Sequence, residues 1–193
     1  VVNKIDKGDE ISSKIYDRVF DPQITKELRI YGLDSADRFE FNGTKAGGIK
    51  IRLIGGSGDD EFVSNDFSNR TIVYDASFEN NIFRGNDNYR KKISDDPTVN
   101  QYNRLYYKYN VFKPVFSVAW NQDDGLFLGA GFDYTSHGFR KEPFANHHRL
   151  LVSHALATQS YHIKYDADFT DLLGKTDLLI RSSVKAPINV ENF

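Results

Sequence analysis

The sequence has no cysteine and no methionine, only five prolines and a single tryptophan. Without cysteine the chain has no disulfide scaffold, no thiolate metal site and no cysteine nucleophile. No run of apolar residues approaches the roughly 18 that a membrane-spanning helix needs. Because even an initiator methionine is missing, we expect an internal piece of a longer, processed precursor.

Neither sign of charge is in excess, with 25 Lys and Arg residues against 27 Asp and Glu residues and a formal net charge of -2. The charges are spread along the chain and form no basic stripe, which argues against nucleic acid as a partner. Aromatic residues reach 14%, mostly Phe and Tyr, and these residue types favour β structure. Helical periodicity is convincing in no segment, so we expect an all-β fold.

The first part of the chain, residues 1–77, reads as a small β module of short strands. Short alternating segments are separated by turn signals such as Asp21-Pro22 and Asn42-Gly43. The expected strands cover residues 13–20, 25–33, 38–41, 49–54 and 71–74.

Residues 78–110 differ in composition from the segments around them. The stretch 78–101 is polar and rich in Asn, Asp, Arg and Lys, which is typical of a solvated linker or long loop. The aromatic stretch 102–109 that follows is expected to be a lead-in strand.

From residue 111 to residue 193 the alternation becomes regular, as in the stretch 125–135 (GLFLGAGFDYT). There Leu126 and Leu128 fall on one strand face, and Gly129 and Gly131 fall on the other. Five strands of about ten residues are expected, the length that crosses a bilayer when tilted, whereas soluble strands usually have about five or six. A soluble antiparallel sheet with one solvated face predicts the same alternation. The strands begin with 111–120 and 125–135 and continue with 149–158, 161–169 and 178–184.

The segments FSVAWNQDDGLFLGAGFDY (116–134) and GFRKEPFANHH (138–148), with the strands up to Phe193, resemble the first strands of Omp85-type barrels. They are similar to the C-terminal barrel of large outer-membrane proteins of Bacteroidetes, in which a calcineurin-like metallophosphoesterase domain precedes the barrel. The segments TKELRIYGLDSADRFEFNG and IKIRLIGGSGDDEF are similar to the β module between those two parts.

The resemblance implies an outer-membrane location in the bacterial cell envelope, with membrane lipid as a partner. It also implies contacts with other outer-membrane or periplasmic proteins through strand edges. The implied role is to anchor surface components, or to assist their assembly or translocation.

The catalytic motifs of the phosphoesterase are missing from the chain. Such an enzyme needs clustered Asp, His and Asn ligands for two metals, but Lys7-Gly8-Asp9-Glu10 lacks the His and no GNH tripeptide is present. We therefore expect no catalytic residue here. An alternative hypothesis is an accessory region that positions a phosphoesterase domain located outside this chain. Five strands are also fewer than the eight or so that close a barrel.

One candidate metal site lies in GGSGDDEFV, residues 55–63, which matches a single copy of the nonapeptide of calcium-binding β-rolls. Asp60 would supply a hard oxygen ligand to Ca²⁺. A partial second copy aligns Asp37 with Asp60 and Phe39 with Phe62. Their offset of 23 residues (60 minus 37) favours long stacked solenoid coils, or a repeated hairpin, over a β-roll.

Calcium at Asp60 and Asp37 is thus the candidate cofactor, and its alternative is a glycine-rich turn with solvated carboxylates and a buried Phe. A second functional hypothesis follows from it, a secreted calcium-stabilised β-solenoid or adhesin-like module. The adjacent His147 and His148 should point to opposite strand faces, so they are not expected to bind one metal.

Overall fold

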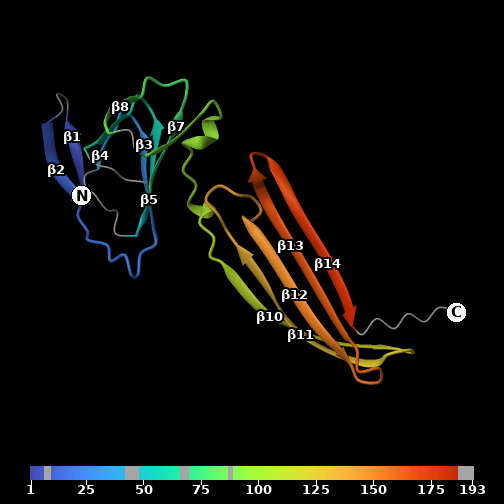
Figure 1. Cartoon of the computed structure of the whole chain (residues 1–193). Coiled ribbons are helices and arrows are strands. Elements are labelled where there is room, and N and C mark those ends of the chain that lie inside the picture. Colours follow the sequence, from blue (N-terminus) through green and yellow to red (C-terminus); the bar gives the residue numbers. More distant parts are fainter. Residues whose placement is uncertain (7–9, 42–47, 66–69, 87–88, 187–193) are drawn as a thin grey trace. The chain divides into compact units, whose positions relative to one another are not determined.

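The computed structural model describes residues 1–6, 10–41, 48–65, 70–86 and 89–186. Within these ranges the chain consists of strands and two short 3-10 helices, with no α-helix, which confirms the expected all-β class. It divides into two compact units, Val1–Tyr102 and Asn103–Phe193, and most of their strands are labelled in Figure 1. No helix among the described residues is long and apolar enough to cross a membrane.

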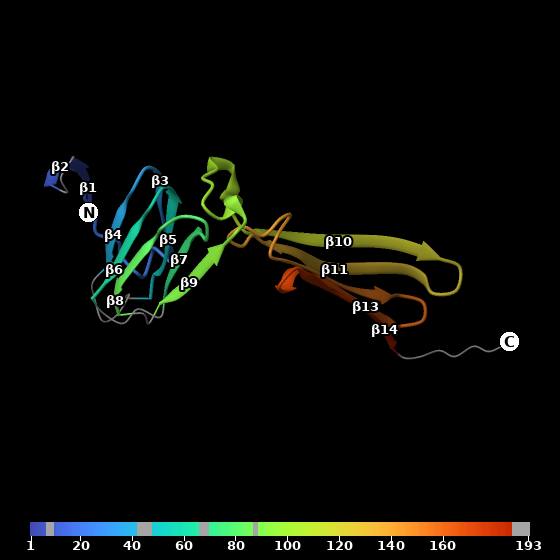
Figure 2. The ribbon, with the colours of Figure 1, turned by 90° about the horizontal axis from the view of Figure 1, so that it is seen from above.

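The first unit contains a parallel β-solenoid made of two sheets (Figure 2). One sheet pairs four parallel strands, β3 (Glu27–Asp34), β5 (Lys50–Ser57), β7 (Thr71–Ala76) and β9 (Arg90–Ser94). The other pairs three parallel strands, β4 (Arg38–Phe41), β6 (Glu61–Ser64) and β8 (Ile82–Gly85). Because the chain alternates between the sheets, it winds in stacked coils.

The register confirms the equivalence that the sequence predicts. Phe39 pairs with Phe62 at an offset of 23 residues (62 minus 39), and Leu28 pairs with Ile51 at the same offset (51 minus 28). Of the two arrangements that this offset left open, stacked coils are correct, because the strands run parallel.

An aromatic stack fills the interior of the coils. The rings of Phe39, Phe62 and Phe83 lie over one another, with centroid distances of 5.0 Å and 5.3 Å. Phe62 is fully buried, and Leu53 and Val73 pack with it from the other sheet. The expected buried Phe after the glycine-rich turn is therefore confirmed.

The linker predicted over residues 78–101 is wrong, because that segment contains two strands of the solenoid, β8 and β9. β8 pairs with β6 and β9 pairs with β7, both in parallel, and the solenoid unit extends to Tyr102. The segment is polar in composition because only a small number of its side chains contact the core, among them Phe83 and Tyr89. The expected lead-in strand over 102–109 is also wrong, since a 3-10 helix spans Arg104–Tyr106.

An antiparallel hairpin of β1 (Val2–Asp6) and β2 (Glu10–Tyr16) precedes the coils. The strand expected over 13–20 therefore begins and ends earlier than predicted. The turn signal Asn42-Gly43 lies outside the described residues.

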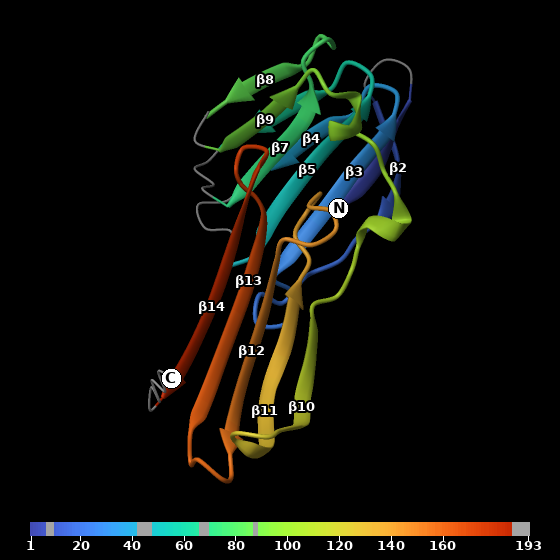
Figure 3. The ribbon, with the colours of Figure 1, turned by 90° about the vertical axis from the view of Figure 1, so that its right-hand side faces the viewer.

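The second unit is a five-stranded antiparallel meander, with neighbours in space following the order of the chain (Figure 3). The five strands, each of 10 to 13 residues, overlap the predicted ranges, although the third begins and ends three residues earlier than the predicted 149–158. They are β10 (Val111–Asn121), β11 (Gly125–Ser136), β12 (Asn146–Ala155), β13 (Tyr161–Leu173) and β14 (Thr176–Ala186). In the part of the unit that is described, they form one open layer.

Candidate functional site

A ladder of Asp and Asn side chains lies at the corner between the two solenoid sheets, one residue per coil. The backbone N–H of Asp37 donates to Asp60 Oδ1 at 2.8 Å, and that of Asp60 donates to Asn81 Oδ1 at 2.8 Å. Each side chain thus satisfies an amide of the preceding coil where the chain leaves one sheet for the other. The predicted pair Asp37 and Asp60 is brought together by this ladder.

Two carboxylates of successive coils face each other beside this ladder. Asp60 and Asp75 are 1% and 0% exposed, and their Oδ2 atoms have no hydrogen-bond partner among the described residues. A Cβ atom added at Gly55 would lie well under 3.0 Å from both Oδ2 atoms. Only glycine therefore leaves room for the two oxygens to converge at this point.

The remaining oxygens of these carboxylates are held by amide donors. Asp75 Oδ1 accepts from the backbone N–H of Ala76 at 2.8 Å and from Asn100 Nδ2 at 2.6 Å. Asn100 Nδ2 also donates to Glu79 and to the carbonyl of Gly56. These bonds fix the orientation of the carboxylate and leave its Oδ2 directed toward Gly55.

A similar pair of oxygens lies one coil earlier. A Cβ atom added at Gly32 would lie well under 3.0 Å from Asp37 Oδ2 and from the carbonyl oxygen of Gly55. Asp37 Oδ2 is buried and has no partner in the described part of the chain. The interior corner is thus lined by oxygens over two coils.

Burial raises the pKa of Asp60 to about 7, and the negative charges of Asp75 and Asp37 add to the effect. Burial likewise raises the pKa of Asp75, with a further contribution from Glu79. Burial also raises the pKa of Asp37. The common cause is that water is excluded while no positive charge replaces it.

Sequence reasoning identified Asp60 but missed Asp75, the carboxylate that faces it. Asp75 follows Gly55 by 20 residues (75 minus 55), whereas the recognised repeat has an offset of 23, so aligning the copies could not find it. The signal that could have found Asp75 is strand alternation, because Thr71, Val73 and Asp75 fall on the same face of β7 and Val73 lies in the core of the solenoid. Among the described residues, no three His, Cys, Asp or Glu side chains form a metal-binding group.

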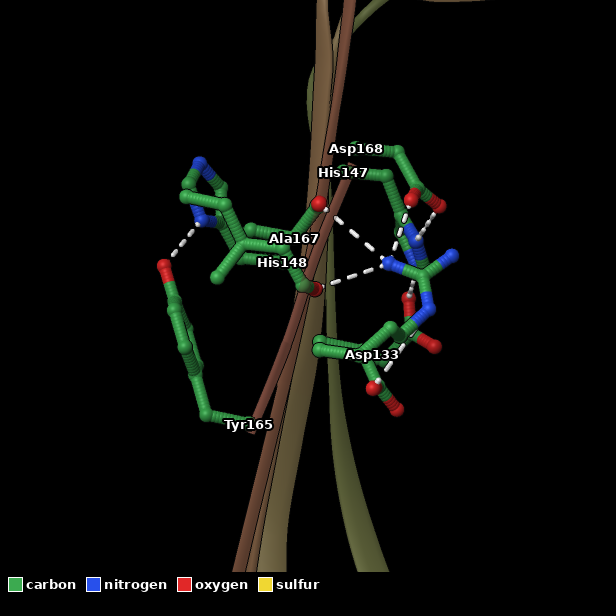
Figure 4. Close-up of polar contacts among 9 residues, drawn as sticks. Asp133, His147, His148, Tyr165, Ala167 and Asp168 are labelled. Carbon is green, nitrogen blue, oxygen red and sulfur yellow. Dashed lines mark hydrogen bonds and ion pairs between the residues drawn. The ribbon is translucent and has the colours of Figure 1, made fainter. Parts of the chain in front are cut away.

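A second polar cluster crosses four strands of the meander (Figure 4). His147 Nε2 lies 2.9 Å from Asp133 Oδ1, and its Nδ1 lies 3.7 Å from Asp168 Oδ2. Arg181 Nη1 binds Asp168 Oδ1 at 2.6 Å. His147 and Asp168 are directly opposite each other, whereas Asp133 and Arg181 reach this pair diagonally from the strands on either side, so the cluster ties β11, β12, β13 and β14 together.

His148 lies on the opposite face of the sheet from His147, as the sequence predicts (Figure 4). Its Nδ1 is 2.8 Å from the hydroxyl of Tyr165, and its ring stacks beside those of Tyr134 and Tyr165. The two consecutive histidines thus lie in different surroundings, His147 among charged side chains on one face and His148 among aromatic side chains on the other.

The face that carries His148 is rich in apolar side chains, several of them well exposed. Phe116 is 78% exposed and Trp120 is 71% exposed. One complete row across the five strands is apolar and consists of Phe116, Ala130, Val152, Ile163 and Val184.

The other face carries a row in which the sign of charge alternates from strand to strand. Its members, in register, are Lys113, Asp133, Arg149, Asp166 and Arg181. Opposite charges on neighbouring strands attract, so this row stabilises the order of the meander.

No protein-family model matches the chain, and neither a curated protein nor a solved structure shows significant similarity to it.

Proposed function

We propose that the chain is a non-catalytic part of an Omp85-like protein of the bacterial outer membrane. In this proposal the sheet β10–β14 contributes the first strands of a membrane barrel. The solenoid unit is a periplasmic or interdomain module. The protein anchors surface components or assists their assembly or translocation.

The observation that carries the proposal is the separation of apolar and charged side chains between the two faces of the meander. With five strands about 4.8 Å apart and about ten residues per strand at a rise of about 3.4 Å, the apolar face covers roughly 800 Å². The largest apolar patch on a soluble monomer is typically about 300 to 600 Å². Contact with lipid would remove this surface from water.

The charged face supports the same proposal. Its alternating row and the His147 cluster are paired across strands, as suits a face that lines a water-filled lumen. Strand lengths of 10 to 13 residues fit a hydrocarbon core of about 30 Å when strands are tilted. Five strands are fewer than the eight or so of the smallest barrels, so closure requires further strands at the edges of β10 and β14.

The single tryptophan allows a direct test. Trp120 pairs with Leu126 on the apolar face, so lipid should surround it. In liposomes with brominated acyl chains, we expect its fluorescence to be strongly quenched by the lipid and weakly quenched by aqueous iodide. The matched control is Trp120→Phe with Phe127→Trp, which moves the indole to the charged face opposite Ala119.

In the control, lipid quenching should fall and iodide quenching should rise. Equal quenching of both proteins by iodide would contradict the proposal. So would a monodisperse, folded monomer that needs neither detergent nor lipid.

A further inference from the structure

We propose that the carboxylates of Asp60 and Asp75, which belong to successive coils, form a calcium site inside the solenoid beside Gly55. The site belongs to the first unit, so it does not depend on where the meander resides. The ligands are carboxylate oxygens, which hard cations such as Ca²⁺ prefer.

The geometry points to a ligand at this place. Two carboxylate oxygens from different coils approach the same side of the Gly55 Cα atom, where a Cβ atom would collide with both of them. Both residues are almost completely buried, and both oxygens are without a partner among the described residues. Buried carboxylates that face each other stay ionised only with a compensating positive charge.

Among the described residues, no Lys or Arg supplies that charge. The buried Arg52 forms an ion pair with Glu27, and Lys91 lies over the Phe83 ring. In the described ranges no Lys or Arg forms an ion pair with Asp60 or Asp75. A bound cation would supply it.

Two further side chains with oxygen atoms, Asn100 and Glu79, border the two carboxylates. The Oδ1 atom of Asn100 is buried and unpartnered in the described structure, and its amide nitrogen already binds Asp75. The Oε1 atom of Glu79 accepts a hydrogen bond from the backbone N–H of Gly58 at 3.2 Å, and its Oε2 atom accepts one from Asn100 Nδ2. Calcium takes about six to eight oxygen ligands in flexible geometry, so it suits this oxygen-rich corner better than a transition metal does.

Calorimetric titration of CaCl₂ into the chelator-treated full chain tests the proposal. We expect one site, with a Kd on the order of 0.1–1 mM, as in extracellular calcium modules. Asp60→Asn and Asp75→Asn should each weaken binding by at least about tenfold, because each removes a charged ligand. The Asn side chain fits, since Asn81 occupies the ladder position equivalent to Asp60.

The matched control is Asp59→Asn. Asp59 belongs to the same glycine-rich segment, but its side chain is exposed. Its Oδ1 atom accepts a hydrogen bond from the backbone N–H of Asn80 at the surface. Its substitution should leave calcium binding unchanged. An equal loss in Asp59→Asn and Asp60→Asn would place the ion on the surface and overturn the proposal.

A second measurement needs no variant. Terbium bound at Asp75 should be sensitised by the neighbouring Tyr74, and calcium should displace that luminescence. If the folded wild-type chain binds no calcium at about 10 mM, well above the expected Kd range, and shows no displaceable terbium signal, the two carboxylates share a proton instead. That result would leave the fluorescence test of the membrane proposal unaffected.

Discussion

The buried Asp60 gives the solenoid a pH dependence opposite to that of ordinary acid denaturation. Its pKa is raised from 3.8 to about 7 in the folded chain. The protonated carboxyl therefore favours folding, and this contribution is lost as pH rises through the folded pKa. Without a divalent cation, the solenoid should be more stable at mildly acidic pH than at pH 8.

The size of the effect follows from linkage. For a group with these two pKa values, stability falls by about 2 kcal/mol between about pH 5.5 and pH 8. The raised pKa of Asp75 acts in the same direction. In Asp60→Asn, the contribution of Asp60 disappears, so the variant should lose most of the pH dependence and be more stable than the wild type at pH 8.

Hydrogen exchange measured by mass spectrometry in EDTA provides the assay. The free energy of opening is taken from peptides that cover β5 and β7, over a series of urea concentrations, so that it reports on the solenoid unit alone. Stability that is constant or rises between pH 5.5 and pH 8 would refute the reasoning. The same slope in Asp60→Asn would refute it as well, because the effect would then belong to other groups.

Three further substitutions test the packing. Phe62→Ala should lower the solenoid's free energy of unfolding by about 3–5 kcal/mol, as for other buried aromatics, measured by the same exchange experiment. Gly55→Ala should cost about 1–3 kcal/mol through overpacking, because its Cβ would collide with buried carboxylate oxygens; unchanged exchange would contradict this. Asp133→Lys should destabilise the meander by about 0.2–1 kcal/mol per like-charged pair, seen in urea unfolding followed by Trp120 fluorescence, and Lys113→Glu should restore part of the loss.

Much of the fold could be predicted because local patterns coincide with the tertiary arrangement. The meander strands alternate strictly, and the connections between them are short, so their positions follow from periodicity. In the solenoid, Asp37 with Phe39 and Asp60 with Phe62 recur at one offset, and the structure pairs them.

The third coil could not be predicted because its repeat changes length. Phe62 pairs with Phe83 at an offset of 21 (83 minus 62), and Val73 pairs with Lys91 at 18 (91 minus 73). A fixed period therefore loses the later equivalences. With few core residues in a polar segment, the coil has the composition of a linker.

Of the two carboxylates of the candidate site, Asp75 could not be predicted for a related reason. Asp37 and Asp60 could be aligned in sequence, but Asp75 becomes their neighbour only through coil stacking. Whether a carboxylate is solvated or buried also depends on its neighbours in space. Asp59 and Asp60 are adjacent in sequence, yet one is exposed and the other is buried.

The alternating charge row also constrains what can join the open sheet. Because the row has an odd number of members, both edge strands end on a cation, Lys113 on β10 and Arg181 on β14. Two copies of the sheet that met edge to edge in this register would bring like charges together, which is unfavourable. An incoming strand is preferred when it carries Asp or Glu in that row, so the row selects both the identity and the register of its neighbour.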